Sequence, residues 1–358
     1  MNFKYYYNRY IIFFTMIVAI IALVCKKCFG TGENMISFGK SIKTLVNMNK
    51  SDYNAFMNSY DVFDDPKYNK DDENKVNSFY NVLVPLMELG SLKKFYIPPL
   101  MDPNRKKFYD LSWNQELFER KMTDAMQLGP GKVVLDIGCG TGLIANLVQE
   151  HSGAKVVGIN ISPKQISKAK ENAIANGKLG TKLEFKQGSI NDKLEFPDNS
   201  FDAVYIVQVD PYAHNYSFLM SEVRRVLKPG GIFSDLAVPT LNGFDPTNEN
   251  HLRMAREAKR VGGIPVWRSV DYYLKGCTDN GFSIILSEHL KNYEMMQVAM
   301  NFFYPLGTFI KFLNNIGLVN NKIVASLDRM NEHAISLIEG DRQELFTTNY
   351  WILCRANL

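Results

Sequence analysis

The chain has 358 residues, 46% of them apolar, and a formal net charge of +4. This length suits one large α/β domain with appended segments and allows a full hydrophobic core. Lys and Arg are dispersed without a run of five, so the composition speaks against a nucleic-acid-binding surface.

The amino-terminal region, residues 1–30, contains an uncharged apolar run, Tyr10–Cys25, with basic residues on both sides. Its sixteen residues are fewer than the roughly 20 that span a bilayer, and a cleaved signal peptide is the alternative. We expect a single-pass anchor in a membrane, that of the endoplasmic reticulum, because the domain described below needs a cytosolic cofactor. The flanking charges leave the orientation open. Cys25 and Cys28 form a C-x-x-C without a second pair, so no metal site is predicted.

Two segments separate this region from the regular part of the chain. Residues 31–75 are polar and dense in charge and turn formers, which predicts a solvated linker. Residues 76–112 are richer in apolar and aromatic residues but are interrupted by Pro85, Gly90 and a pair of prolines. They are too broken for a membrane span, and we expect a helical lid packed on the following domain.

From residue 113 to 290 short β-branched runs alternate with amphipathic helices, beginning with a helix over Trp113–Leu128. Alternation at this spacing predicts a parallel sheet with helices on both faces. Residues 291–346 are mostly helical and apolar, and we expect them to cap the ligand edge of the sheet. Residues 347–358 are predicted to form the last strand. The expected strands lie within "KVVLDIG", "AKVVGIN", "KLEFKQGS", "FDAVYIVQV", "GGIFSDLAV", "FSIILSEHL" and "TTNYWILCRANL".

The segment "VVLDIGCGTG" is a buried strand that runs into a glycine-rich turn. Gly138, Gly140 and Gly142 allow backbone amides to approach a ligand at the start of the next helix. The preceding Asp136 would repel a pyrophosphate but attract a cation such as S-adenosylmethionine. The element, with Cys139 inside it, resembles motif I of class I S-adenosylmethionine-dependent methyltransferases. The resemblance implies that cofactor and a Rossmann-like α/β fold whose seventh strand is antiparallel.

Four further residues are candidates for cofactor binding. Asn160 ends the second strand, where this superfamily usually has a carboxylate for the ribose hydroxyls, and an amide can also pair with a hydroxyl. Gln165, in the first turn of the next helix, is a candidate partner, with a solvated helix position as the alternative. Ser189 stands where an aspartate is frequent beside the adenine. Ile190 is expected to pack on the adenine ring.

The fourth strand ends in "VQVDPYAH", Val207–His214. This stretch lacks one proline of the D-P-P-Y signature of amine-methylating enzymes that act on nucleic acid. That function is also disfavoured by the dispersed charge. Because the segment follows a strand opposite the glycine turn, Gln208, Asp210 and Tyr212 are predicted to face the acceptor.

Several other stretches resemble the sterol C-methyltransferase family, most tellingly "FDPTNENH" and "GGIP". The likeness implies methyl transfer to a sterol carbon by an enzyme that needs no metal. Members that methylate side-chain carbon 24 have an aromatic-acidic Y-E-x-G-W element, of which this chain keeps only Glu88 and Gly90. They also carry an acid and a histidine at positions occupied here by Gln208 and Tyr212.

These departures favour the branch that methylates ring carbon 4, although carbon 24 stays open. In that chemistry Asp210 would be the base, and Tyr212 and Gln208 would donate hydrogen bonds to a developing oxyanion. Structural roles for Asp210 as a helix cap and Tyr212 as a pocket wall stay open too. Alternative acceptors are a triterpene, a quinone or a lipid amine, and a homo-oligomer is also open.

Overall fold

The structure is a computed structural model that describes residues 40–41, 43–64, 68–89 and 92–358. The apolar run Tyr10–Cys25 and the C-x-x-C at Cys25 and Cys28 lie outside these ranges. Within them, no helix combines the length and the apolar character needed to cross a membrane.

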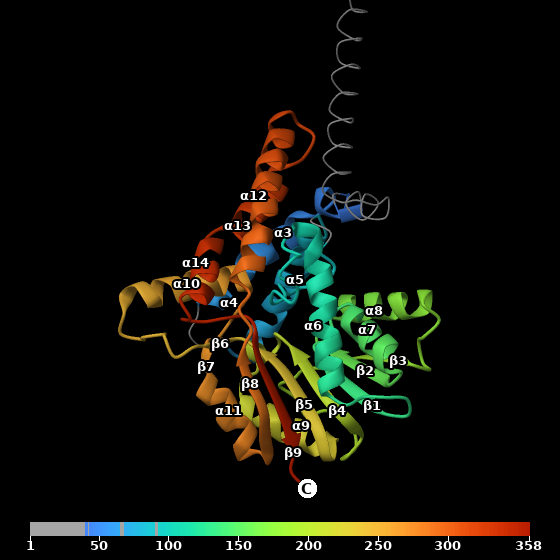
Figure 1. Ribbon diagram of the computed structural model, residues 1–358. Coiled ribbons are helices and arrows are strands. Elements are labelled where there is room, and N and C mark those ends of the chain that lie inside the picture. The colour runs from blue at the N-terminus through green and yellow to red at the C-terminus, as the bar shows by residue number, and fades with distance from the viewer. Residues whose placement is uncertain (1–39, 42, 65–67, 90–91) are drawn as a thin grey trace, which may run out of the picture.

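A seven-stranded sheet forms the centre of the molecule, in the order β3-β2-β1-β4-β5-β9-β8 (Figure 1). Strands β1 to β5 are parallel, and β9 runs antiparallel to both β5 and β8. All seven predicted strands are present, and the antiparallel position of the last one is confirmed. The strands are β1 (Val133–Ile137), β2 (Lys155–Asn160), β3 (Leu183–Gln187), β4 (Phe201–Val207), β5 (Leu227–Ala237), β8 (Phe282–His289) and β9 (Tyr350–Ala356).

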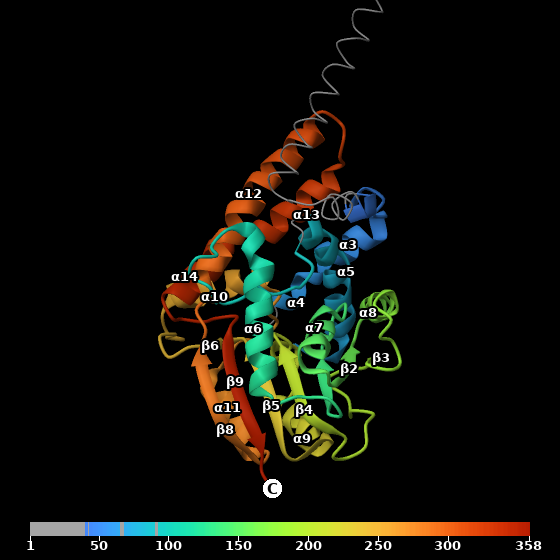
Figure 2. The same cartoon turned by 45° about the vertical axis from the view of Figure 1, so that its right-hand side comes forward.

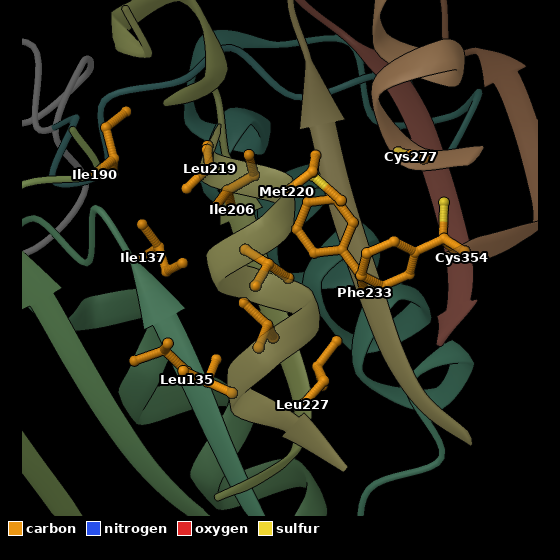
Figure 3. Packing of buried hydrophobic residues seen from close by; sticks show 14 of the residues in the cluster. Leu135, Ile137, Ile190, Ile206, Leu219, Met220, Leu227, Phe233, Cys277 and Cys354 are labelled. Carbon is orange, nitrogen blue, oxygen red and sulfur yellow. The ribbon is translucent and has the colours of Figure 1, made fainter. Parts of the chain in front are cut away.

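Helices cover both faces of this sheet, which explains why its central strands are apolar on both sides. On one face Phe118 and Val148 pack against the sheet. On the other face Leu219 and Met220 pack near Ile206 (Figure 3). The first layer is α6 (Leu111–Ala125), α7 (Leu143–Ser152) and α8 (Pro163–Ala175), and the second is α9 (Tyr216–Val226) and α11 (Val270–Asp279).

A second group of helices lies beyond the carboxyl ends of the parallel strands (Figures 1 and 2). Its members share one hydrophobic cluster or pack beside it. They include the segment that was predicted to cap this edge. The group comprises α3 (Lys50–Ser59), α4 (Asp61–Asp64), η1 (Lys70–Asp72), α5 (Glu73–Leu89), α10 (Glu249–Gly262), α12 (Tyr293–Asn315), α13 (Asn321–Asn331) and α14 (Ala334–Arg342). The short elements η2 (Phe108–Asp110), η3 (Asp210–Tyr212), β6 (Pro239–Thr240) and β7 (Arg268–Ser269) complete the described fold.

The prediction of a solvated linker over residues 31–75 is corrected for its described part. Residues 50–64 form α3 and α4, and Phe56, Tyr60 and Phe63 are almost completely buried against α5. Phe79 of α5 contacts all three rings. The aromatic residues are spaced by four and three positions, so they share one helix face even though the segment is polar on average.

Candidate active site

The turn after β1 places three glycines in left-handed conformations, each for a different reason. At Gly138 (φ +80°) a Cβ atom would lie 2.3 Å from Val209 Cγ2. At Gly142 (φ +76°) a Cβ atom would lie 2.7 Å from Phe185 Cζ. The glycine at this position therefore lets α7 approach the sheet. At Gly140 (φ +54°) the nearest atom would be Gln165 Oε1 at 3.9 Å. Gly140 therefore leaves space for a ligand rather than for protein.

Asp136, near the end of β1, is buried, and its Oδ2 atom has no hydrogen-bond partner among the described residues. Burial raises the pKa of this carboxyl to about 7, while the nearby Tyr205 hydroxyl acts in the opposite direction. It lines a small pocket with Cys139, Gly138 and Gly140. A buried carboxyl oxygen without a hydrogen-bond partner in the described chain, beside a glycine that leaves open space, is suited to a cationic ligand.

Cys139 is almost fully buried in the same turn, and its amide donates to Ile159 O at 3.0 Å. Burial raises the pKa of its thiol. A protonated, buried thiol is unreactive. Cys139 therefore contributes packing and backbone geometry to the pocket.

A larger cavity, the edge cavity, adjoins this pocket and shares Gly138 and Gly140 with it. Its empty volume, open to solvent, is about 1030 Å³. Asn160 and Gln165 line it, and Asn160 Nδ2 donates to Gln165 Oε1 at 2.6 Å. The remaining Asn160 oxygen and Gln165 amide group can pair with hydroxyls of a ligand. The structure thus brings together the two residues predicted to bind the ribose.

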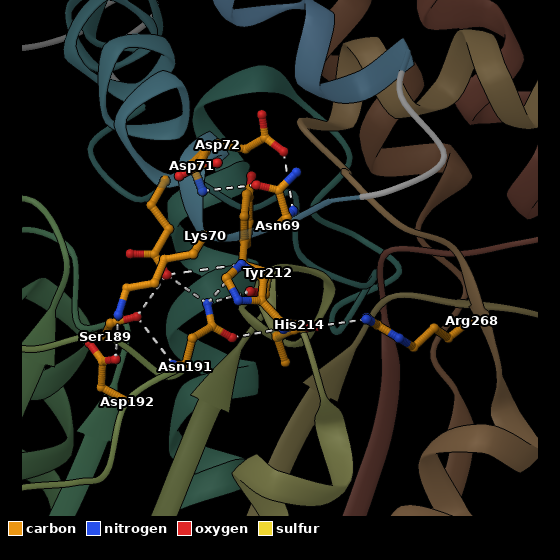
Figure 4. Close-up of polar contacts among 12 residues, drawn as sticks. Asn69, Lys70, Asp71, Asp72, Ser189, Asn191, Asp192, Tyr212, His214 and Arg268 are labelled. Atoms are coloured by element: carbon orange, nitrogen blue, oxygen red, sulfur yellow. Dashed lines mark hydrogen bonds and ion pairs between the residues drawn. The ribbon is translucent and has the colours of Figure 1, made fainter.

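Ser189 and Ile190, in the loop after β3, line the same cavity. Ser189 Oγ donates to Glu73 Oε1 at 3.1 Å, and Asn191 Nδ2 donates to the same atom at 2.9 Å. Figure 4 shows Ser189, Asn191 and His214 gathered beside the segment that leads into α5. A carboxylate is therefore present beside Ser189, but α5 provides it instead of the β3 loop.

The segment Gln208–Tyr212 that follows β4, here called the rim, contains the three predicted catalytic residues. Two of them face the edge cavity and the third faces away from it. Gln208 and Tyr212 line the edge cavity. Gln208 has a left-handed backbone (φ +57°), and its Nε2 donates to Thr348 O at 2.7 Å and Asn349 Oδ1 at 2.9 Å. Tyr212 Oη donates to Gly263 O. A strained backbone at a cavity rim is common at functional sites.

Asp210 is not on the wall of the edge cavity, which corrects the prediction that it faces the acceptor. Its side chain is fully buried, and its Oδ2 accepts from Val238 N at 3.2 Å. Burial raises its pKa to about 7, with the Tyr273 hydroxyl, the Val238 amide and the Arg268 guanidinium acting in the opposite direction. It does not cap the following helix either, because Asn215 does so. Asp210 therefore joins the rim to β5 and α11.

The cavity wall includes residues that the sequence analysis missed, among them Tyr68, Asn77 and Tyr80. Asn77 Oδ1 is buried without a hydrogen-bond partner in the described chain. Tyr80 Oη lies 2.9 Å from Tyr212 Oη and is the donor of that pair, since Tyr212 gives its proton to Gly263 O. The spacing of Asn77 and Tyr80 on one helix face was a usable signal, but the segment had been assigned only as a lid.

Beside the edge cavity lies a second, more apolar one, the acceptor cavity. Its empty volume, also open to solvent, is about 850 Å³. Tyr80, Gln208 and Thr348 belong to the walls of both cavities. No carboxylate of the described chain lines either one. The remaining wall is apolar and is formed largely by Leu83, Met87, Met296, Ala299, Met300, Phe303, Met330, Leu337 and Ile338.

Comparison with known proteins agrees with this arrangement. Residues 135–234 match the family described as methyltransferase domain. The chain is similar to sterol 24-C-methyltransferase ERG6B of Gibberella zeae, with 27% identity over 86% of this chain and 89% of the relative. It is also similar to cycloartenol-C-24-methyltransferase 1 of Oryza sativa subsp. japonica, with 28% identity over 78% and 84%.

Among solved structures, geranyl diphosphate methyltransferase in complex with SAM superposes with a TM-score of 0.56 at 16% identity. The match covers 73% of this chain and 94% of that one. At this identity the likeness concerns the fold. It places the β1 turn and the edge cavity of this chain within a fold that accommodates the cofactor.

Proposed function

We propose that this chain, which belongs to the sterol C-methyltransferase family of S-adenosylmethionine-dependent methyltransferases, methylates carbon 24 in the side chain of a sterol. Both curated relatives described above are named for carbon 24. None of the similarities supports ring carbon 4, the position that the sequence analysis favoured. The observation that carries the proposal is the apolar acceptor cavity, which meets the edge cavity at Tyr80 and Gln208.

The residues of the β1 turn and the neighbouring loops would hold the cofactor. Asp136 provides a buried carboxyl oxygen, Oδ2, that has no hydrogen-bond partner among the described residues and suits a cationic group, and Gly140 provides room for the ligand beside the backbone. Asn160 and Gln165 provide amides for ribose hydroxyls, and Ile190 provides an apolar surface. When bound, S-adenosylmethionine supplies an electrophilic methyl group to the acceptor.

The aromatic side chains at the junction of the cavities fit alkene methylation. Electrons of the side-chain double bond would form the new bond to the methyl carbon while the bond from that carbon to the sulfonium sulfur breaks, which leaves S-adenosylhomocysteine and a carbocation on the acceptor. Tyr68, Tyr80 and Tyr212 line the edge cavity, and Tyr80 also lines the acceptor cavity. The ring centroid of Tyr212 lies 6.1 Å from those of the other two. Ring faces within about 6 Å of a cation stabilise it by about 0.5–2 kcal/mol. These tyrosines therefore compensate for the missing Y-E-x-G-W aromatics.

The acceptor must finally lose a proton. Since neither cavity wall in the described chain carries a carboxylate, an oxygen atom of a polar group at the junction would relay the proton to the solvent to which the cavities open. Tyr80, Gln208 and Thr348 are the polar residues shared by both walls. The apolar walls beyond them offer water few hydrogen-bond partners beside the cation.

The proposal is tested with the purified full chain, S-adenosylmethionine labelled in its methyl group, and matched sterols with and without a carbon 24 double bond. We expect label only in the unsaturated sterols, and fragmentation of the product to place the methyl group on the side chain. A methyl group on the ring system would refute the proposed position. Label confined to a quinone, a triterpene or a phospholipid would refute the sterol as acceptor.

A further inference from the structure

The turn from α12 to α13 lies at the end of the helical group that is farthest from the sheet (Figures 1 and 2). Phe312 and Ile316 near the end of α12, Leu318 in the turn to α13, and Val46 are exposed by 46%, 39%, 47% and 39%. We call these four residues the apolar tip. Exposed aliphatic and aromatic side chains that gather in one place often indicate an interaction surface.

The tip is held in this arrangement by its backbone. Gly317 adopts a left-handed conformation (φ +77°), and Asn314 Nδ2 donates to Val319 O at 2.9 Å across the turn. Asn320 caps α13 by accepting from Ile323 N at 3.2 Å, and its Nδ2 donates to Val46 O at 3.2 Å. These hydrogen bonds fix the turn and join Val46 to it. The apolar residues are thus held in exposed positions by the hydrogen bonds of the turn.

The chain that precedes the described residues indicates what covers the tip. Lys40, the first described residue, lies six positions before Val46. Fourteen residues separate Lys40 from the end of the apolar run Tyr10–Cys25, so that run is within about 50 Å of Lys40 at full extension. Lys40 and Lys43 are exposed on the same segment. Lysines beside apolar side chains are suited to the headgroup region of an anionic bilayer.

Helix α12 joins the tip to the acceptor cavity. Phe303 lies on the cavity wall, and Phe312 lies nine residues farther along the same helix, which corresponds to about 14 Å. A bilayer at the tip would therefore be close to the apolar cavity. We propose that the apolar tip docks on the surface of an anionic lipid bilayer. The proposal concerns where the protein binds lipid and does not depend on which carbon is methylated.

Hydrogen–deuterium exchange of the full chain tests the docking directly. It is measured with and without vesicles of phosphatidylcholine and phosphatidylserine in a 7:3 ratio. We expect vesicles to slow exchange at least fivefold in peptides that cover residues 308–320. Peptides that cover α8, where Ile174 is 63% exposed, should not change. Unchanged exchange at residues 308–320 while the protein is bound to vesicles would overturn the proposal, because another segment would then carry the binding.

Matched variants separate the tip from general apolar exposure. F312S/I316S in the full chain should weaken binding to these vesicles at least tenfold in a flotation assay, whereas I174S should leave binding unchanged. Circular dichroism melting verifies that both variants are folded. Equal binding by a folded F312S/I316S variant would contradict the proposal. Light scattering gives the oligomeric state of both proteins. If the wild type is a dimer and the F312S/I316S variant is a monomer that still binds vesicles, the tip is instead an interface with a second copy of the chain.

Discussion

The hydroxyl oxygens of Tyr80 and Tyr212 lie 2.9 Å apart although 132 positions separate the two residues. Tyr80 belongs to α5 and Tyr212 to the rim after β4, so the contact joins the helical group to the catalytic sheet. Burial raises the pKa of both hydroxyls, which keeps them protonated near neutral pH. Their rings are consequently neutral, electron-rich faces on the cavity wall.

The first prediction concerns the ring of Tyr80. Tyr80→Ala should lower the single-turnover rate of methyl transfer about 30-fold, the equivalent of about 2 kcal/mol of lost cation–π stabilisation. Tyr80→Phe retains the ring and should lose less than fivefold. Rapid-quench measurement with labelled methyl donor gives both rates. Equal losses in the two variants would assign the effect to the hydroxyl group.

The second prediction concerns the charge of Asp136. Since burial raises the pKa of this carboxyl to about 7, it is mostly protonated in the free protein at pH 6. A cation binds the ionised form, so the affinity for S-adenosylmethionine should rise about tenfold between pH 6 and pH 8. Calorimetric titration measures the change. Asp136→Asn should bind at least 100-fold more weakly at pH 8 and show no such pH dependence; a retained dependence would implicate another group.

The third prediction concerns Gly140. In Gly140→Ala the added methyl group meets no protein atom closer than 3.9 Å but enters the space proposed for the cofactor. We expect the melting temperature without ligand to fall by only a few degrees and the stabilisation by S-adenosylmethionine to disappear. Gly177→Ala is the matched control, since Gly177 is also left-handed (φ +65°) with no neighbouring atom. If S-adenosylmethionine raises the melting temperature of both variants as much as that of the wild type, the assignment of Gly140 to the cofactor site is wrong.

The fourth prediction concerns the part of α5 that faces the edge cavity. Asn77→Ala removes a buried oxygen without a partner in the described chain and should raise the dissociation constant of S-adenosylmethionine about five- to tenfold. Asn74→Ala, on the exposed side of the same helix, should have no effect. Fluorescence titration of both variants measures the constants. No difference between them would exclude α5 from cofactor binding.

The fifth prediction follows from the burial of Asp210. Burial raises the folded-state pKa of Asp210, and that of the buried Asp235 coupled to it, above the ordinary value of 3.8, so the folded protein holds these protons more tightly than the unfolded chain. Asp210 therefore stabilises the fold below about pH 4 and loses this contribution as the pH rises to 7, at up to about 1.4 kcal/mol per unit. Asp210→Asn should flatten this decline in urea unfolding between pH 5 and 8. The exposed control Asp279→Asn should keep the wild-type slope.

The strands of the sheet could be predicted from the sequence because they are short β-branched runs between glycine-rich turns and amphipathic helices. Asp136 and the three glycines could be proposed as cofactor-binding residues because their chemistry is local to one turn. Asp210 could not be oriented in this way. Which side of the rim it faces depends on the left-handed backbone at Gln208, two residues earlier, and on the Val238 amide in a distant segment.

The contribution of α5 was missed for a different reason. Whether Asn77 and Tyr80 face a cavity or solvent depends on where α3, α12 and the β3 loop pack, and these contacts are distant in sequence. Average polarity also concealed the helix face formed by Phe56, Tyr60 and Phe63. The roles of all these residues in binding and catalysis stay predictions until the variants are measured.

The position of β9 has a consequence for synthesis on the ribosome. Because β9 pairs with both β5 and β8, β5 keeps one unpaired edge and β8 has no strand partner until residues 350–356 have emerged. Gln208 likewise has no partners for its amide until Thr348 and Asn349 arrive. Nascent chains that stall before this point would expose unpaired edges of β5 and β8 to aggregation and would be clients for chaperones. The cofactor turn and the catalytic rim would thus mature at different times during translation.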